Sequence, residues 1–168
     1  MLKEAKVSDI LYIRTVVESA SRTLGFLPGE MKEKFSPYAA PIYDKMYELL
    51  STPSAQKLIA EQFVKPIPVN YLRGAHLAGK FVIVDEAQNF TKKELTTILT
   101  RIGEFSKIIV AGDPQQSDIN GNSGFNLFFN AFRNEVSRKQ GIFTFEFGTE
   151  DIVRSELVKY IVKVTSSL

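Results

Sequence analysis

The sequence predicts an α/β protein built on a parallel sheet, and three observations support this fold class. Two continuous apolar runs, at 81–84 and 107–111, have the length and composition of strands that are buried on both faces. Between them, residues 89–105 have the apolar spacing of a helix. A strand, a helix and a second strand at this spacing form a right-handed βαβ unit, whose strands are parallel.

The segments before this unit are predicted from their periodicity and their prolines. The segment 10–14 has strand character, and 15–26 has helical spacing. Residues 30–50 are helical in period, but Pro37 and Pro41 interrupt them, so we expect a kinked or split helix. The remaining expectations are a helix opened by Pro53, and a short strand at 69–72 that lies at a sheet edge or begins after Pro68.

The central helix and the carboxyl-terminal third carry clear local signals. Thr91, with Glu94 three residues later, is a capping box that marks the start of the central helix. Beyond the βαβ unit we expect a helix at 123–136, a strand at 141–147 and a helix at 150–164. The expected organisation is a single domain over residues 1–168, with a helical insertion at 30–66.

Composition limits the classes of function. The 168 residues are 44% hydrophobic and 24% charged, with a formal charge of +2, too mild to require nucleic acid or a membrane as partner. The absence of cysteine removes disulfides and thiolate sites, and the single histidine rules out a histidine-rich metal cluster. No leader-like or membrane-spanning run stands out, so we expect a soluble cytoplasmic protein with no membrane partner.

The candidate chemistry lies just after the two best strands. In open α/β sheets, ligands bind outside the carboxyl ends of the strands. In NTP hydrolysis, the first of two adjacent acids at a strand end holds magnesium and the second accepts a proton from water. The residues at these two ends are Asp85, Glu86, Gln88, Gly112, Asp113 and Gln116. Acids also follow strands simply because loops are polar, and the second polar strand end makes this alternative weaker.

These segments resemble the PhoH family of P-loop ATPases, which is similar in turn to the ATPase core of superfamily 1 helicases. The resemblance rests first on FVIVDEAQN at 81–89, LTRIG at 99–103 and AGDPQQSDI at 111–119. It extends over most of the chain through LGFLPGE at 24–30, SPYAAPIYDKMYELL at 36–50, IPVNYLRGAHL at 67–77 and DIVRSELVKYIV at 151–162.

The resemblance implies ATP and Mg²⁺ as cofactors and gives roles to single residues. Asp85 would be the Walker B residue that holds magnesium, Glu86 the catalytic base and Gln116 the sensor of the γ-phosphate. Gln88 would position the site, and Asp113 belongs to the same cofactor-binding loop. Arg154 and Arg101 would stabilise charge in the transition state, across a subunit boundary in one arrangement.

Arg73 has two interpretations that the sequence leaves open. It follows the strand expected at 69–72, where it contacts nucleotide or RNA, or forms a structural ion pair.

The resemblance also shows departures from the family. The family's phosphate loop is absent, so the expected fold is a RecA-like P-loop NTPase sheet, flanked by helices, without its first strand and phosphate loop. Gly74, Gly79 and Lys80 spell GxxxxGK, but Lys80 enters a strand instead of a helix, so we interpret this match as a coincidence. A companion chain or parent chain with a Walker A motif is therefore expected, in a homo- or hetero-oligomer.

Two functions from different classes follow. The first is an ATPase fragment whose ATP hydrolysis is linked to RNA binding or remodelling, and which is inactive alone. The second is a non-catalytic, degenerate ATPase module that binds RNA or protein. Four phenylalanines at helical spacing could stack on bases, although a helix face in the core is the preferred interpretation; they are Phe125, Phe128, Phe129 and Phe132.

Overall fold

The structure is a computed structural model, and it describes residues 2, 4, 6–15, 31–72, 74–119, 121–153 and 155–165. The chain divides into two compact units, residues 1–128 and 129–168.

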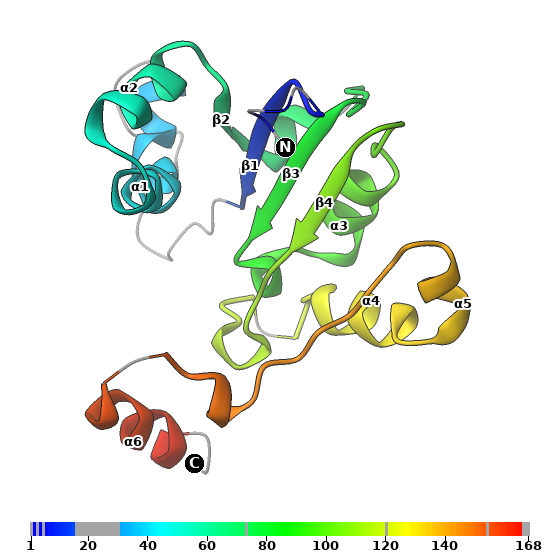
Figure 1. The fold of residues 1–168 in the computed structure, drawn as a ribbon. Coiled ribbons are helices and arrows are strands. Elements are labelled where there is room, and N and C mark those ends of the chain that lie inside the picture. The colour runs from blue at the N-terminus through cyan, green and yellow to red at the C-terminus, as the bar shows by residue number, and fades with distance from the viewer. Residues whose placement is uncertain are drawn as a thin grey trace. The chain divides into compact units, whose positions relative to one another are not determined.

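The first unit is built on a four-stranded parallel sheet (Figure 1). Its strands are β1 (Asp9–Arg14), β2 (Val64–Pro68), β3 (Lys80–Asp85) and β4 (Lys107–Val110), in the order β2-β1-β3-β4. This parallel sheet with flanking helices confirms the predicted α/β class and is consistent with a RecA-like P-loop NTPase fold. The three strands predicted at 10–14, 81–84 and 107–111 are confirmed as β1, β3 and β4.

Helices pack at two places against this sheet. The helix α3 (Lys92–Leu99) connects β3 to β4, and the capping box predicted at its start is present, with the Thr91 side chain and Glu94 bonded in both directions. The helices α1 (Met31–Leu49) and α2 (Thr52–Ala60) lie on the β2 side of the sheet (Figure 1). Pro53 opens α2, as predicted.

Two apolar clusters hold these layers together. The larger joins one face of the sheet to α3, because alternate residues of each strand point to the same face; its central members are Leu11, Ile13, Val82, Val84, Phe90, Leu95 and Ile98. The smaller joins Met46 of α1, Ala55 of α2 and Val64 of β2. Phe125 and Phe128 pack against the larger cluster, in agreement with a core role for these two side chains.

The prediction of a strand at 69–72 is wrong. These residues form the 3-10 helix η2 (Val69–Leu72), and the strand is β2, which contains Pro66 and Pro68. Ile10 N–H donates to Phe63 C=O, so Phe63 and every second residue after it face β1. Pro66 and Pro68 lie at the alternate positions, and their nitrogens therefore point away from β1. The prolines are tolerated because β2 is an edge strand and those nitrogens face no neighbour in the sheet.

Of the two alternatives expected at 30–50, the split helix is wrong, because α1 runs without a break from Met31 to Leu49, and the kinked helix stays a prediction. A proline inside a helix removes a backbone hydrogen bond, yet tertiary packing supplies most of the stability of a helix in a protein. Ile42, Tyr43 and Met46 pack in the smaller cluster and anchor the second half of α1. The predicted insertion at 30–66 is helical to Ala60, and its last residues belong to β2.

The carboxyl-terminal part is less regular than predicted. The helix expected at 123–136 is divided into α4 (Phe125–Phe132) and α5 (Glu135–Lys139), because the Asn134 side chain caps α5 by accepting from Ser137 N–H. Then follow the 3-10 helix η5 (Thr149–Asp151) and α6 (Glu156–Thr165). The strand expected at 141–147 is absent, and its three phenylalanines, Phe143, Phe145 and Phe147, are 61%, 78% and 84% exposed. An extended segment becomes a strand only with a neighbour to pair with, and no described strand pairs with this segment.

Two further expectations concern the termini and the membrane. The helix expected at 15–26 lies, apart from Thr15, outside the described residues. Within the ranges that the structure describes, no helix has the length and apolar character that a membrane span requires.

The core assignment predicts the effect of one substitution. Phe90 is fully buried in the larger cluster, so Phe90→Ala should lower the free energy of unfolding by about 3–5 kcal/mol. Phe147→Ala is the matched control, because 84% of Phe147 is exposed, and it should change stability by less than about 0.5 kcal/mol. Urea unfolding followed by circular dichroism measures both, and equal losses would contradict the assigned core.

Candidate functional site

The carboxyl ends of three neighbouring strands meet at one edge of the sheet. Arg14 at the end of β1 pairs in register with Asp85 at the end of β3. On the other side of β3, Ala111 N–H donates to Val84 C=O and Ala87 N–H donates to Ala111 C=O, which carries the β3–β4 pairing past the ends of both strands. The polar residues after β3 and β4 are thereby brought together, as the parallel arrangement predicts.

Asp85 lies between two side chains of β1. The Tyr12 hydroxyl donates a short hydrogen bond to Asp85 Oδ2, and Arg14 Nε lies 3.9 Å from the same oxygen. Burial, followed by the hydrogen bond to Asp85, raises the pKa of Tyr12, so the phenol stays protonated and donates. One third of the Asp85 side chain remains exposed, which leaves it accessible to a ligand.

Glu86 has an unusual backbone conformation for a residue with a side chain. Its φ and ψ are 55° and 44°, in the left-handed region that costs a non-glycine residue on the order of 1 kcal/mol or more. Two hydrogen bonds hold its carboxylate, from Arg14 Nη2 at 2.8 Å and from Gln88 Nε2 at 2.6 Å. Arg14 therefore faces both acids of the pair.

Gln88 connects the two loops through a buried side-chain amide. Its side chain donates to Glu86 Oε2 and, at 3.5 Å, to the backbone oxygen of Gln116, while its Oε1 accepts from Asp113 N–H at 3.0 Å. The residue is only 1% exposed, so these bonds form away from water. A buried amide with three partners fixes the position of the groups around it.

The loop after β4 is shaped by Gly112 and Asp113. A Cβ atom on Gly112 would lie 2.8 Å from Gln88 Oε1 and 2.9 Å from Gln88 N, so a larger residue cannot approach Gln88 this closely. The Asp113 carboxylate accepts from Gln115 N–H at 3.0 Å and from Gln116 Nε2 at 2.6 Å. Asp113 thus orients the Gln116 side chain within an exposed loop.

The structure brings together five of the eight predicted site residues: Asp85, Glu86, Gln88, Asp113 and Gln116. Arg101 lies elsewhere, because its carbonyl accepts from Leu77 N–H before the amino end of β3, at the opposite edge of the sheet from Asp85. Its role in charge stabilisation across a subunit boundary stays a prediction. Arg73 and Arg154 lie outside the described residues.

The GxxxxGK spelling at 74–80 has a structural explanation. Gly74 and Gly79 have φ angles of 82° and 65°, which favour glycine in the turns before β3. Lys80 begins β3, and its Nζ lies 2.7 Å from Asp9 Oδ1 at the amino edge of the sheet. This lysine therefore lies at the edge opposite Asp85.

The acidic side chains at the carboxyl edge of the sheet fit a magnesium ion whose other ligands are phosphate oxygens and water. No cluster of three or more acidic, histidine or cysteine side chains that could hold a metal occurs in the described part of the chain. Mg²⁺ commonly binds through one or two carboxylates together with phosphate oxygens and water. A partly exposed Asp85 fits that pattern, whereas a metal site made of protein groups alone would need more ligands.

Sequence reasoning missed Tyr12 and Arg14 as members of this site. They come from β1, which has no motif of its own, and only the β1–β3 register shows that they face Asp85. A polar side chain near the carboxyl end of a strand predicted to be parallel was the available signal.

Comparisons with known proteins identify relatives over nearly the whole chain. A family model described as "PhoH-like protein" matches residues 1–166. The chain is 35% identical over 162 residues to a PhoH-like protein of Bacillus subtilis (strain 168), covering 96% of this chain and 50% of the relative. It is 38% identical over 153 residues to Protein PhoH of Escherichia coli (strain K12), covering 90% and 42%. The chain thus spans about half the length of the curated relatives that it matches.

An isosteric substitution tests the Gln88 bridge. Gln88→Glu keeps the acceptor for Asp113 N–H but places a carboxylate 2.6 Å from Glu86, so it should lower the free energy of unfolding by about 2–4 kcal/mol at pH 7. The loss should shrink towards pH 4, because a neighbouring like charge makes the introduced carboxyl take up a proton. Gln115→Glu, in the exposed loop, is the control. Urea unfolding at both pH values measures the difference, and a pH-independent loss would contradict the bridge.

Proposed function

This chain belongs to the PhoH-like protein family, and we propose on that premise that it supplies the magnesium-binding and water-activating part of an ATP hydrolysis site. We propose further that hydrolysis is linked to RNA binding or remodelling. The observation that carries the first proposal is the convergence of Asp85, Glu86 and Gln116 at the carboxyl edge of adjacent parallel strands, joined by the buried Gln88. The RNA link rests on the resemblance to the family alone.

Asp85 would hold the magnesium ion of a bound magnesium-ATP. The ion supplies Lewis-acid chemistry by neutralising charge on the phosphate oxygens. The chain's own contribution is the orientation of Asp85, whose Oδ2 accepts from Tyr12 and lies 3.9 Å from Arg14 Nε. Because these contacts converge on one oxygen, the other carboxylate oxygen is the candidate ligand.

Glu86 would accept the proton of the attacking water. Its backbone is left-handed directly after β3, and the bonds from Arg14 and Gln88 hold its carboxylate in place. A strained backbone that its surroundings maintain is common at functional sites. Gln116, oriented by Asp113, would contact the terminal phosphate through its amide without a change in charge.

We propose that the phosphate-binding loop comes from another segment or chain. Phosphate loops leave a strand and enter a helix, so that backbone N–H groups face the phosphates. The loop at 74–79 enters β3 instead, which does not meet this requirement.

The two edges of the sheet differ in their capacity to receive a further strand. In a parallel ladder, every second residue of a strand bonds to the same neighbouring strand. Ala111 is bonded to β3, so Ile109, two residues earlier, faces β3 as well. The backbone groups of Ile108 and Val110 therefore point away from β3. Within the described residues no strand pairs with them. On β2, prolines occupy two of the outward positions. These differences support the addition of a phosphate-loop strand beside β4.

One observation favours the second function, a non-catalytic module that binds RNA or protein. Arg14 already lies against both acids, 2.8 Å from Glu86 Oε1 and 3.9 Å from Asp85 Oδ2, where a cationic ligand would bind. An arginine in this position offsets part of the negative charge of the pair without a metal. The same arginine serves the first function if it holds Glu86 in place while Asp85 binds the metal.

Replacement of the proposed base distinguishes the two functions. In the complete protein, or in this chain assembled with a phosphate-loop companion, Glu86→Gln should reduce ATP turnover by about 10²–10⁴-fold and leave ATP binding intact. Glu104→Gln, on an exposed loop, is the matched control and should turn over ATP as the unchanged protein does. Single-turnover hydrolysis and equilibrium ATP binding are the two measurements. Unchanged ATP turnover in Glu86→Gln would contradict the role of Glu86 as the base. Absence of ATP hydrolysis in the unchanged protein would instead support the non-catalytic module.

A further inference from the structure

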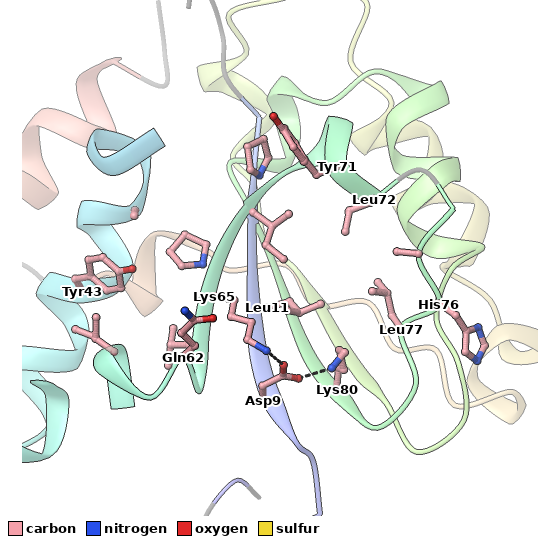
Figure 2. Close-up of a pocket in the computed structure, with 17 residues that line it drawn as sticks. Asp9, Leu11, Tyr43, Gln62, Lys65, Tyr71, Leu72, His76, Leu77 and Lys80 are labelled. Atoms are coloured by element: carbon pink, nitrogen blue, oxygen red, sulfur yellow. Dashed lines mark hydrogen bonds and ion pairs between the residues drawn. The ribbon is translucent and has the colours of Figure 1, made fainter. Parts of the chain in front are cut away.

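A pocket lies at the edge of the sheet opposite Asp85. Its volume is about 710 Å³, within the range of small-molecule pockets. It extends from the amino ends of β1 and β3, across β2, to α1 and the η2 region (Figure 2). Its lining includes Asp9 and Lys80 but none of the five residues that converge near Asp85, so it is separate from the proposed ATP site.

One end of the pocket carries two lysines around a single carboxylate. Lys65 Nζ lies 2.6 Å from Asp9 Oδ2, and Lys80 Nζ lies 2.7 Å from Asp9 Oδ1 (Figure 2). The strand register places Asp9 directly beside Lys80, and it pairs Lys65 with Leu11, two residues along β1 from Asp9, so that all three side chains lie on one face. The cluster therefore has one positive charge more than it has negative charges.

The charge states of this cluster follow from its geometry. Burial tends to raise the pKa of Asp9, which is 5% exposed, but the hydrogen bonds from Lys65, Lys80 and Ser8 outweigh burial and lower it. Asp9 is thus ionised at neutral pH. Each ammonium group has three N–H donors, and the side chains of Lys65 and Lys80 are 39% and 25% exposed, so donors remain for a ligand.

The rest of the pocket is mainly apolar. Its walls include Leu11, Ile67, Leu72 and Leu77, with Tyr43 and Tyr71 farther from the lysines (Figure 2). Pro66 and Pro68 also line it, and they lack the N–H groups with which an edge strand would bind an added strand. This composition favours a small ligand over a peptide that adds to the sheet.

We propose that this pocket binds a carboxylic acid with an apolar body, whose carboxylate lies against Lys65 and Lys80. A single excess positive charge matches a monoanion, whereas a dianionic phosphate would bring additional negative charge close to Asp9. The apolar body covers the walls formed by β1, β2 and the η2 region. The ligand would gain orientation from charge-assisted hydrogen bonds and affinity from apolar burial.

Octanoate is the probe, and 1-octanol is its neutral counterpart with the same apolar length. Titration of the ¹⁵N-labelled chain, followed by amide chemical shifts, should show octanoate shifting Leu11, Lys65 and Leu77 with at least about tenfold higher affinity than 1-octanol. Equal affinities, or shifts spread over other surfaces, would overturn the proposal.

Three variants separate the charge from the apolar walls. Lys65→Met keeps most of the side-chain length and should weaken octanoate about tenfold while leaving 1-octanol unchanged. Lys107→Met, on exposed β4, is the matched control and should change neither affinity. Asp9→Asn removes the competing carboxylate and should strengthen octanoate binding. An octanoate affinity that is unchanged in Lys65→Met, or that is lower in a folded Asp9→Asn protein, would overturn the assignment of the carboxylate site to Lys65 and Lys80.

Discussion

The parallel register of β1, β3 and β4 is the constraint on which the rest of this structure depends. It places Arg14 beside Asp85 and continues through Ala111 to bring the loop after β4 against Ala87 and Gln88. A shift of one residue would turn Tyr12 and Arg14 to the other face of the sheet and leave Asp85 without its β1 partners. The site therefore depends on the same backbone pairing that forms the core.

The sheet separates two kinds of chemistry at its two edges. At the carboxyl edge, two acids face one arginine, so negative charge is in excess; at the amino edge, two lysines face Asp9, so positive charge is in excess. Lys80 and Asp85 are the first and last residues of the same strand. This arrangement explains why the GxxxxGK spelling and the acid pair, although adjacent in the sequence, belong to two separate surfaces.

Apolar runs and capping residues predicted the elements of the fold that depend on their own residues alone. The β3–α3–β4 unit has continuous apolar strands and a capping box, so each element could be placed from its own residues. The segments at 69–72 and 141–147 were predicted as strands and are not, because strand formation depends on a partner that periodicity does not reveal. The convergence of Asp85, Glu86 and Gln116 was predictable, because these residues follow the ends of predicted parallel strands. The contacts of Tyr12 and Arg14 with the acid pair were not predictable, because they depend on the β1–β3 register. The left-handed backbone of Glu86 carries no sequence signal, because glutamate does not favour that conformation.

We propose that this chain holds one part of an ATP site and takes the phosphate-binding part from another segment or chain. Isothermal titration of magnesium-ATP into the chain, alone and together with a companion chain that carries a strand followed by GxxxxGK[ST], tests this proposal. We expect no measurable binding of magnesium-ATP to the chain alone and saturable binding to the assembly. Tight binding of magnesium-ATP by the isolated chain would contradict this proposal.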